Sequence, residues 1–348
     1  MSLSPAFWNA LLAAEMPGYR SRPILDEILK SRAEPLSYLL TRAPLTPAER
    51  ERVRNVNPRD LESVMKAGAT LLSDSGLPDA LLESPNPPLA LFAWGKAEVI
   101  HQPTIAIVGT RGATTYGKAV AMKFAEVLAA AGVTIVSGGA LGIDGAAHRG
   151  ALAGGGSTIA VLATGIDGVY PTVHRGLFQH IREHGCLISQ FAAGTKPMKH
   201  RFVVRNYLVA AISQAVLVVE APEKSGALNT AHVAAEMGRP VYVVSANIDN
   251  LNFRGSHALI RDGAILTDHP DIVLHGLGLA SGPVPQAKTH LSTEQEQILA
   301  ALSSHPTAPE LIVAKTGLAP EVVLSELTML ELDGFVLQDL GGFALRPL

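Results

Sequence analysis

The amino-acid sequence predicts an α/β protein built on a doubly wound parallel sheet. Short apolar runs, such as residues 105–108 and 215–219, have the length and composition of strands that are buried on both faces. Alanine-rich stretches with helical spacing separate these runs. Repeated β-α-β-α order implies parallel strands whose two faces are both covered by helices. We therefore expect one large sheet domain over residues 86–278 of the 348-residue chain.

The first segment of the chain is expected to be helical. Apolar residues recur at helical spacing in residues 7–12. Thr46, which is followed by proline and by the acidic Glu49, has the pattern of a helix N-cap. A proline-rich stretch at residues 83–88 interrupts helix and strand alike. These features predict a helical domain over residues 1–85.

The sheet domain follows with alternating strands and helices. A helix with Val120, Phe124 and Leu128 on one face is expected after the first strand. The strands are expected at residues 105–108, 134–136, 158–162, 186–189, 215–219 and 241–244.

The last part of the chain changes composition twice. Residues 279–289 are rich in small residues and proline and have the composition of a linker. In residues 290–348, three helical stretches precede two short apolar runs that flank a Gly-Gly turn, which is the pattern of a winged helix. The helices are expected at residues 293–302, 309–316 and 320–332.

Composition limits the environment in which the protein works. Cys186 is the only cysteine, which excludes an internal disulfide and fits a reducing compartment. The N-terminus lacks the basic start and apolar core of a signal peptide. No apolar run is as long as a membrane span, which needs about 18 residues. We expect a cytoplasmic protein without membrane contact.

The net charge of −3 hides an uneven distribution of charge. Residues 104–275 hold 14 Lys and Arg against 11 Asp and Glu, whereas residues 276–348 hold 3 against 8. A site for a polyanion is therefore expected in the middle of the chain, while the tail repels phosphate.

Glycine-rich loops follow three of the expected strands. In open parallel sheets, ligands bind beyond the carboxyl ends of the strands, where free N–H groups at helix N-termini attract anions. The glycines are also explained by tight turns that pack helices onto the sheet, but three loops on one edge favour a phosphate-lined groove. The candidate residues are Gly109, Thr110 and Arg111 of the first loop, Ser137, Gly138 and Gly139 of the second, and Ser225 and Gly226 of the third.

A strip of cations and aromatic rings lies at residues 195–207. Surfaces that bind single-stranded nucleic acid combine cations along the phosphates with rings on which bases stack. The alternative is a solvated charge cluster with Phe202 and Tyr207 in the core. The candidate DNA-binding residues of the strip are Lys199, Arg201, Phe202, Arg205 and Asn206.

Motifs for catalysis are scarce. The chain has no G-x-G-x-x-G, no P-loop and no metal-binding spacing among its 12 histidines. Asp144 and His148 are explained by helix capping and packing. Glu220, at the end of a strand, is suited either to acid–base chemistry or to orienting neighbouring loops. We expect no enzyme, no catalytic residue, no cofactor and no metal.

Together these motifs resemble the DNA-processing A family (DprA, also called Smf). The resemblance covers about residues 80–270 and follows the order of the family's pieces. It rests on Ile107-Val108-Gly109-Thr110-Arg111, Ser137-Gly138-Gly139-Ala140-Leu141-Gly142-Ile143-Asp144, Arg205-Asn206 and Ser225-Gly226-Ala227-Leu228.

The resemblance implies an extended Rossmann-like domain flanked by a sterile-alpha-motif-like helical domain and a winged helix. It implies a protein that binds and protects single-stranded DNA in natural transformation and recombination, loads the RecA recombinase onto it, and forms a homodimer. By position in the motifs, Arg111 would hold phosphate, Lys199 and Phe202 would form the basic and base-stacking part of the pocket, and Arg205 would be the motif arginine.

The chain departs from the family at three positions. Leu141 and Tyr207 stand where arginine is usual, and His174 stands where asparagine is usual. Two missing cations predict weaker phosphate binding and a flatter dependence on salt.

Other functions compete with this prediction. A related group of nucleotide enzymes, similar to phosphoribohydrolases, carries a P-G-G-x-G-T-x-x-E pattern after the corresponding strand. Residues 220–228 of this chain lack the double glycine of that pattern. A winged-helix transcription regulator is disfavoured because residues 321–332, the expected third helix, contain no Lys or Arg. We expect this winged helix to bind protein rather than DNA.

Overall fold

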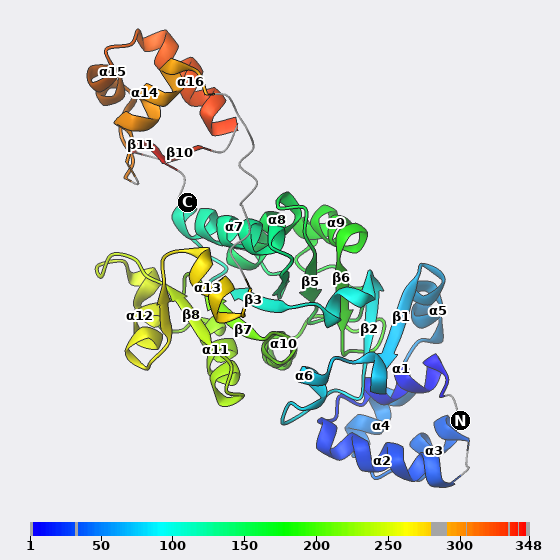
Figure 1. Cartoon of the computed structure of the whole chain (residues 1–348). Helices are drawn as coiled ribbons and strands as arrows, with labels where there is room; N and C mark the ends of the chain where they lie inside the picture. The colour runs from blue at the N-terminus through cyan, green and yellow to red at the C-terminus, as the bar shows by residue number, and fades with distance from the viewer. Residues whose placement is uncertain are drawn as a thin grey trace.

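The computed structural model of the chain describes residues 3–31, 34–279, 291–303, 305–332, 335–339 and 341–345. Its centre is a nine-stranded sheet in the order β1-β2-β6-β5-β4-β3-β7-β8-β9 (Figure 1). The strands are β1 (Ala69–Ser73), β2 (Ala90–Gly95), β3 (Thr104–Val108), β4 (Thr134–Ser137), β5 (Thr158–Val161), β6 (Cys186–Ser189), β7 (Ala215–Val218), β8 (Val241–Val244) and β9 (Ile265–Thr267).

In sheet order, the seven strands β6, β5, β4, β3, β7, β8 and β9 all run parallel, as the sequence predicts. The α/β fold is therefore confirmed. Near one edge of the sheet, β2 runs antiparallel to both of its neighbours, β1 and β6. The chain moves outward from β3 through β4 and β5 to β6, and then returns to place β7 on the other side of β3. This reversal is the topological switch point at which open sheets bind ligands.

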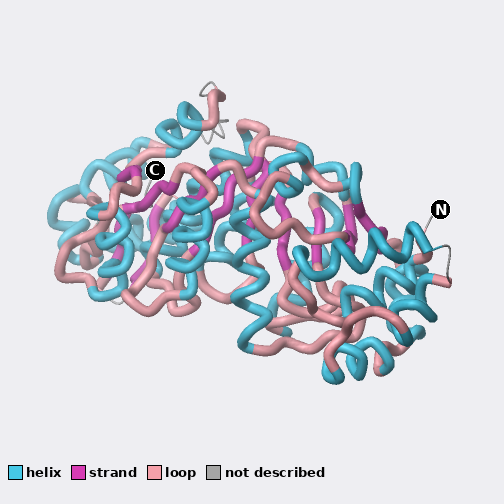
Figure 2. The backbone as a smooth tube through the Cα atoms, turned by 90° about the horizontal axis from the view of Figure 1, so that it is seen from below, coloured by secondary structure: helices cyan, strands magenta, loops and turns pink. Residues whose placement is uncertain are grey.

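Helices cover both faces of the sheet, and Figure 2 shows the strands as a band between them. On one face lie α7 (Thr115–Ala130), α8 (Ile143–Ala153), α9 (Arg175–His184) and α13 (Pro270–Gly276). On the other face lie α6 (Asp79–Leu82), α10 (Lys199–Ile212), α11 (Gly226–Glu236) and α12 (Arg254–Arg261).

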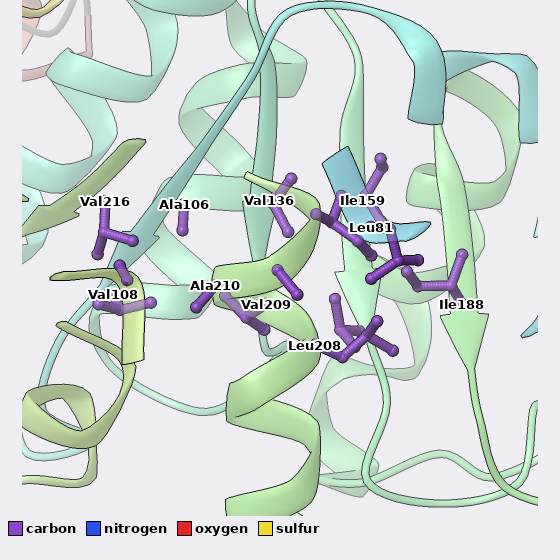
Figure 3. Close-up of a cluster of buried hydrophobic side chains, with 14 of the residues drawn as sticks. Leu81, Ala106, Val108, Val136, Ile159, Ile188, Leu208, Val209, Ala210 and Val216 are labelled. Carbon is purple, nitrogen blue, oxygen red and sulfur yellow. The ribbon is translucent and has the colours of Figure 1, made fainter. Parts of the chain in front are cut away.

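The strands bury both of their faces because successive side chains point to opposite sides. On β3, Ile105 and Ile107 pack with the α7 side, while Ala106 and Val108 pack with the α10 side. Figure 3 shows this second core, where Val209 and neighbouring residues of α10 meet the sheet. The core fixes α10 against the strands whose ends carry the glycine loops.

The N-terminal helices form their own core around Phe7, Leu11 and Ile28. The expected cap at Thr46 is present as a capping box with Glu49. β1 lies inside the segment predicted to be helical, and it pairs with β2. The sheet therefore starts before the predicted boundary at residue 85. The helices are α1 (Pro5–Ala13), α2 (Gly18–Ser31), α3 (Pro35–Thr41), α4 (Pro47–Arg54) and α5 (Pro58–Lys66).

The C-terminal residues form the three helices and the hairpin of a winged helix. Their core contains Ile298, Ile312, Val323, Leu327 and Phe343. The linker predicted at residues 279–289 lies outside the described residues, except for its first residue. The elements are α14 (Thr293–Ala301), α15 (Pro309–Thr316), α16 (Pro320–Leu332), β10 (Val336–Asp339) and β11 (Gly342–Leu345).

Two kinds of feature are missing from the part of the chain that the structure describes. None of its helices is both long and apolar enough to cross a membrane. None of its groups of His, Cys, Asp and Glu could hold a metal ion.

Candidate nucleic-acid interface

A groove of about 340 Å³ lies at the carboxyl ends of β3, β4 and β7, where the three glycine loops meet α10. The glycine loops predicted a groove at this edge of the sheet, and the strand order places it at the switch point. It brings together nine of the predicted site residues, namely Gly109, Thr110, Arg111, Gly138, Phe202, Arg205, Asn206, Ser225 and Gly226.

The first glycine loop opens into this groove. Arg111 is exposed, and its guanidinium carbon lies 4.8 Å from the centre of the Phe202 ring. A cation held over an aromatic face is attracted by the ring. Gly109 has no room for a Cβ atom, which would collide with the Ile143 side chain. The loop therefore approaches α8 closely and presents Arg111 to the groove.

Glu220 fixes the far side of this loop. It is fully buried, and its carboxylate accepts hydrogen bonds from the backbone N–H of Thr114 (3.0 Å), the Thr114 hydroxyl (2.7 Å) and the Asn252 amide (2.9 Å). Its carbonyl oxygen also accepts from the backbone N–H of Thr110 (2.7 Å). Of the two roles open to Glu220, these contacts favour the orientation of loops.

The second glycine loop is filled from within by Arg205, which is only 4% exposed. The Arg205 guanidinium donates hydrogen bonds to the carbonyl oxygens of Gly138 and, at 2.9 Å, of Val161. Burial raises the pKa of the neighbouring Asp144 carboxyl, an effect that Arg205 opposes. Burial likewise lowers the pKa of Arg205. Because this loop directs the carbonyl oxygen of Gly138 toward a cation, it is not arranged as an anion site.

Two residues predicted to contact phosphate from this second loop do not line the groove. Ser137 is fully buried, and its hydroxyl donates to the carbonyl oxygen of Ile107 (2.7 Å). Gly139 packs against Phe178, and its carbonyl oxygen accepts from His174 Nδ1 (3.0 Å). The prediction for Ser137 and Gly139 is corrected because their polar groups are satisfied within the fold.

The basic strip is wound into helix α10, so its residues point in different directions. Phe202, Arg205 and Asn206 have the spacing of one helix face and line the groove. Lys199 is exposed on the first turn, next to the groove but outside its lining.

Arg201, on another face of α10, is not a groove residue. It is 9% exposed, and its guanidinium forms an ion pair with Glu15 of the helical domain (2.6 Å). Burial alone would raise the pKa of Glu15, but the hydrogen bonds and charge of Arg201, together with His200 and Arg52, outweigh burial and lower it. The predicted contact between Arg201 and DNA is corrected, because this side chain joins two domains instead.

The third glycine loop closes the groove. Ser225 caps α11, and its hydroxyl oxygen accepts from the backbone N–H of Ala227 (3.3 Å). The Asn206 amide donates to the Gly226 carbonyl oxygen (3.2 Å), which ties α10 to this loop. The exposed Lys224 also lines the groove. The sequence analysis did not select Lys224 as a site residue, although Lys224 directly precedes Ser225 of the third glycine loop.

A smaller recess of about 50 Å³ continues from the groove past Phe202. Tyr170 lines it, with its ring 5.6 Å from that of Phe202, and was also missed as a site residue. Leu141, 44% exposed, supplies an apolar wall where a cation was expected from the resemblance. Tyr207 lies outside both the groove and the recess.

The fold and this groove define a class: a Rossmann-like protein with a winged-helix domain and an arginine–phenylalanine pair at the switch point of its sheet. The model of the DNA recombination-mediator protein A family matches residues 69–278, and that of the DprA winged helix domain matches residues 282–342. The chain belongs to the DNA recombination-mediator protein A family, whose members are called DprA or Smf.

Curated relatives agree with this assignment over most of the chain. The putative DNA processing protein DprA of Mycobacterium tuberculosis is 39% identical over 297 residues, covering 79% of this chain and 76% of that protein. Protein Smf of Escherichia coli is 36% identical over 276 residues, covering 76% and 74%.

Solved structures are similar as well. DNA processing protein A from Streptococcus pneumoniae superposes with a TM-score of 0.69 at 30% identity, covering 79% of this chain and 98% of that one. The Helicobacter pylori protein superposes with a TM-score of 0.56 at 31% identity, covering 60% and 95%. Its structure is described in terms of a single-stranded DNA binding mode.

Proposed function

We propose that this protein binds single-stranded DNA in the groove, with phosphates at Arg111 and bases against Phe202. The observation that carries the proposal is the Arg111–Phe202 pair, which places a cation and a partly exposed ring in one groove. Single-strand sites combine these two elements. The binding mode described for the Helicobacter pylori relative supports the same ligand.

The bound strand is then protected and passed to the RecA recombinase in natural transformation and recombination. The family's description as a recombination mediator supports this second step. The role is one of binding rather than catalysis. In support, the carboxylate of Glu220, the acid considered for chemistry, accepts hydrogen bonds from three donor groups, which hold loops in place.

We further propose that two copies associate through the edge of the sheet at β9. Ile265 and Leu266 on this edge strand are 43% and 47% exposed. Ile248, which lines the same open hollow as Leu266, is 91% exposed. An edge strand with unpaired backbone groups and apolar side chains is a surface suited to pairing with another chain.

The winged helix is proposed to bind protein. Helix α16 carries no Lys or Arg, and it exposes Leu324 and Met329 beside acidic side chains. An acidic and apolar helix repels phosphate and suits a protein surface.

The first experiment is a fluorescence-anisotropy titration of oligo-dT and of duplex DNA across a salt series. We expect a preference for the single strand. Arg111→Ala should weaken binding about tenfold and reduce the slope of log K against log salt by about 0.7, because one phosphate contact is lost. Lys199→Ala/Phe202→Ala should lose stacking worth about 1–3 kcal/mol per base.

Arg59→Ala, an exposed arginine of the helical domain, is the matched control for the change of charge. Equal affinity for duplex and single strand would contradict the proposal, as would groove variants that behave like Arg59→Ala. In that case the nucleotide-enzyme alternative is tested by nucleotide turnover and its loss in Glu220→Gln.

A further inference from the structure

A second cavity, of about 390 Å³, lies beside the groove along α10. The N-terminal helical domain supplies one wall, with Leu12 and Met16, and α10 supplies another, with Val204 and Tyr207. The volume lies within the range of about 300–1,000 Å³ that is common for small-ligand sites.

The cavity has apolar walls and a polar rim. Asn86 donates its backbone N–H to the Tyr207 hydroxyl (2.7 Å), which fixes the ring and leaves the hydroxyl proton for another acceptor. Gln190 and Asn229, which carry side-chain amides, also line the cavity. Apolar walls with a few convergent polar groups are typical of a binding site.

The cavity and the groove adjoin each other on α10. Val203, 57% exposed, lines both of them. Phe202 points into the groove, whereas Val204 and Tyr207 line the cavity, as the helical repeat requires. A strand that leaves the groove past Phe202 therefore meets the mouth of the cavity.

We propose that this cavity receives bases of the same DNA strand whose phosphates occupy the groove. The inference rests on the proposed function and extends its site into the helical domain. A base has flat apolar faces and hydrogen-bonding edges, which match the Tyr207 ring and the amides of Gln190 and Asn229.

Charge around the cavity permits this occupant. Glu15 lines the cavity, but its carboxylate is neutralised by the ion pair with Arg201 (2.6 Å). Lys199 and His200 are exposed on the same end of α10, where the sugar–phosphate chain would remain in solvent. The helical domain thus contributes a wall of the DNA site.

The test is a series of oligo-dT lengths, from four to sixteen nucleotides, bound to the full chain and to Val204→Trp. Val204 is 39% exposed, so tryptophan is tolerated by the core while it fills the cavity. We expect Val204→Trp to lose about tenfold in affinity for the long oligonucleotides and nothing for the shortest, because stacking of the added bases is lost. Val322→Trp, on α16 at 37% exposure, is the matched control and should bind like the wild type.

Two further measurements separate occupancy from structural damage. Asn229→Ala, an exposed position on α11, should weaken only the long oligonucleotides, by about threefold to tenfold. A long oligonucleotide that is abasic beyond the groove should bind the wild type and Val204→Trp equally.

If Val204→Trp and Asn229→Ala bind every length like Val322→Trp, the cavity holds no base and this inference is wrong, while the groove proposal stands. If the wild type binds no single strand at all, the proposed function fails first.

Discussion

The first and second glycine loops occupy neighbouring positions at one sheet edge, yet they are organised in opposite ways. The first presents the exposed Arg111 to an open groove. The second is filled by the buried Arg205, which donates hydrogen bonds to the carbonyl oxygens of Gly138 in this loop and of Val161 on β5. The difference shows that glycine after a strand does not by itself define an anion site. What matters is whether N–H groups or carbonyl oxygens face the space, and whether the fold already fills it.

The largest expected effect tests whether Arg205 is a structural cation. Arg205→Met should lower the free energy of unfolding by about 3–5 kcal/mol, because it leaves Asp144 and two carbonyl oxygens without their buried partner. Arg111→Met, the same change in the first loop, should alter stability little, because that side chain is exposed. Urea denaturation of both variants measures this, and equal losses would break the comparison.

Low pH should lower the stability of the fold through His148, a residue of helix α8, which follows the second glycine loop. His148, on the helix that follows this loop, is buried, and burial lowers its pKa from 6.5 to about 3. Its Nδ1 lies 2.7 Å from the hydroxyl of Thr158, which itself donates to Ile135. Below pH 6.5 the unfolded chain therefore takes up a proton that the folded chain refuses, and stability falls as pH falls.

At pH 5.0 this loss amounts to about 2 kcal/mol relative to pH 7.5, since one pKa unit is about 1.4 kcal/mol. His148→Gln should not show this part of the loss in urea denaturation at the two pH values. Arg111→Met should keep the whole of the wild-type loss. If His148→Gln and the wild type lose the same stability, His148 is not the group that titrates.

The smallest expected effect separates the two loops by function. Ser137→Ala should cost about 1 kcal/mol of stability, because the buried hydrogen bond to Ile107 is lost, and should leave oligo-dT affinity unchanged. Thr110→Val in the first loop should leave stability unchanged and weaken oligo-dT binding about threefold. Paired denaturation and anisotropy measurements check both, and weaker DNA binding by Ser137→Ala would place the second loop back in the site.

The inner strands were predictable because they are buried on both faces and so form continuous apolar runs, two of which, β3 and β4, lead directly into glycine loops. The outer strands β2 and β9 were not. β2 follows a proline-rich stretch, and β9 spans three residues with two of them exposed, so neither carries that signal. The three helices and the hairpin of the winged helix followed from their periodicity and turn.

The candidate site was predictable as a set of loops but not residue by residue. Sequence gives the order of Arg201, Phe202 and Arg205, whereas the helical turn decides that Phe202 and Arg205 face the groove and Arg201 faces Glu15. Burial of Ser137 depends on contacts with distant strands, which local patterns do not report.

Helix α10 meets three parts of the molecule at once. Its faces contact the groove through Phe202, the neighbouring cavity through Tyr207, and the helical domain through Arg201. The helical domain is consequently not an interchangeable module. A chimera that takes residues 1–68 from a relative must bring a carboxylate at the place of Glu15, or replace Arg201, to avoid leaving a buried charge unpaired.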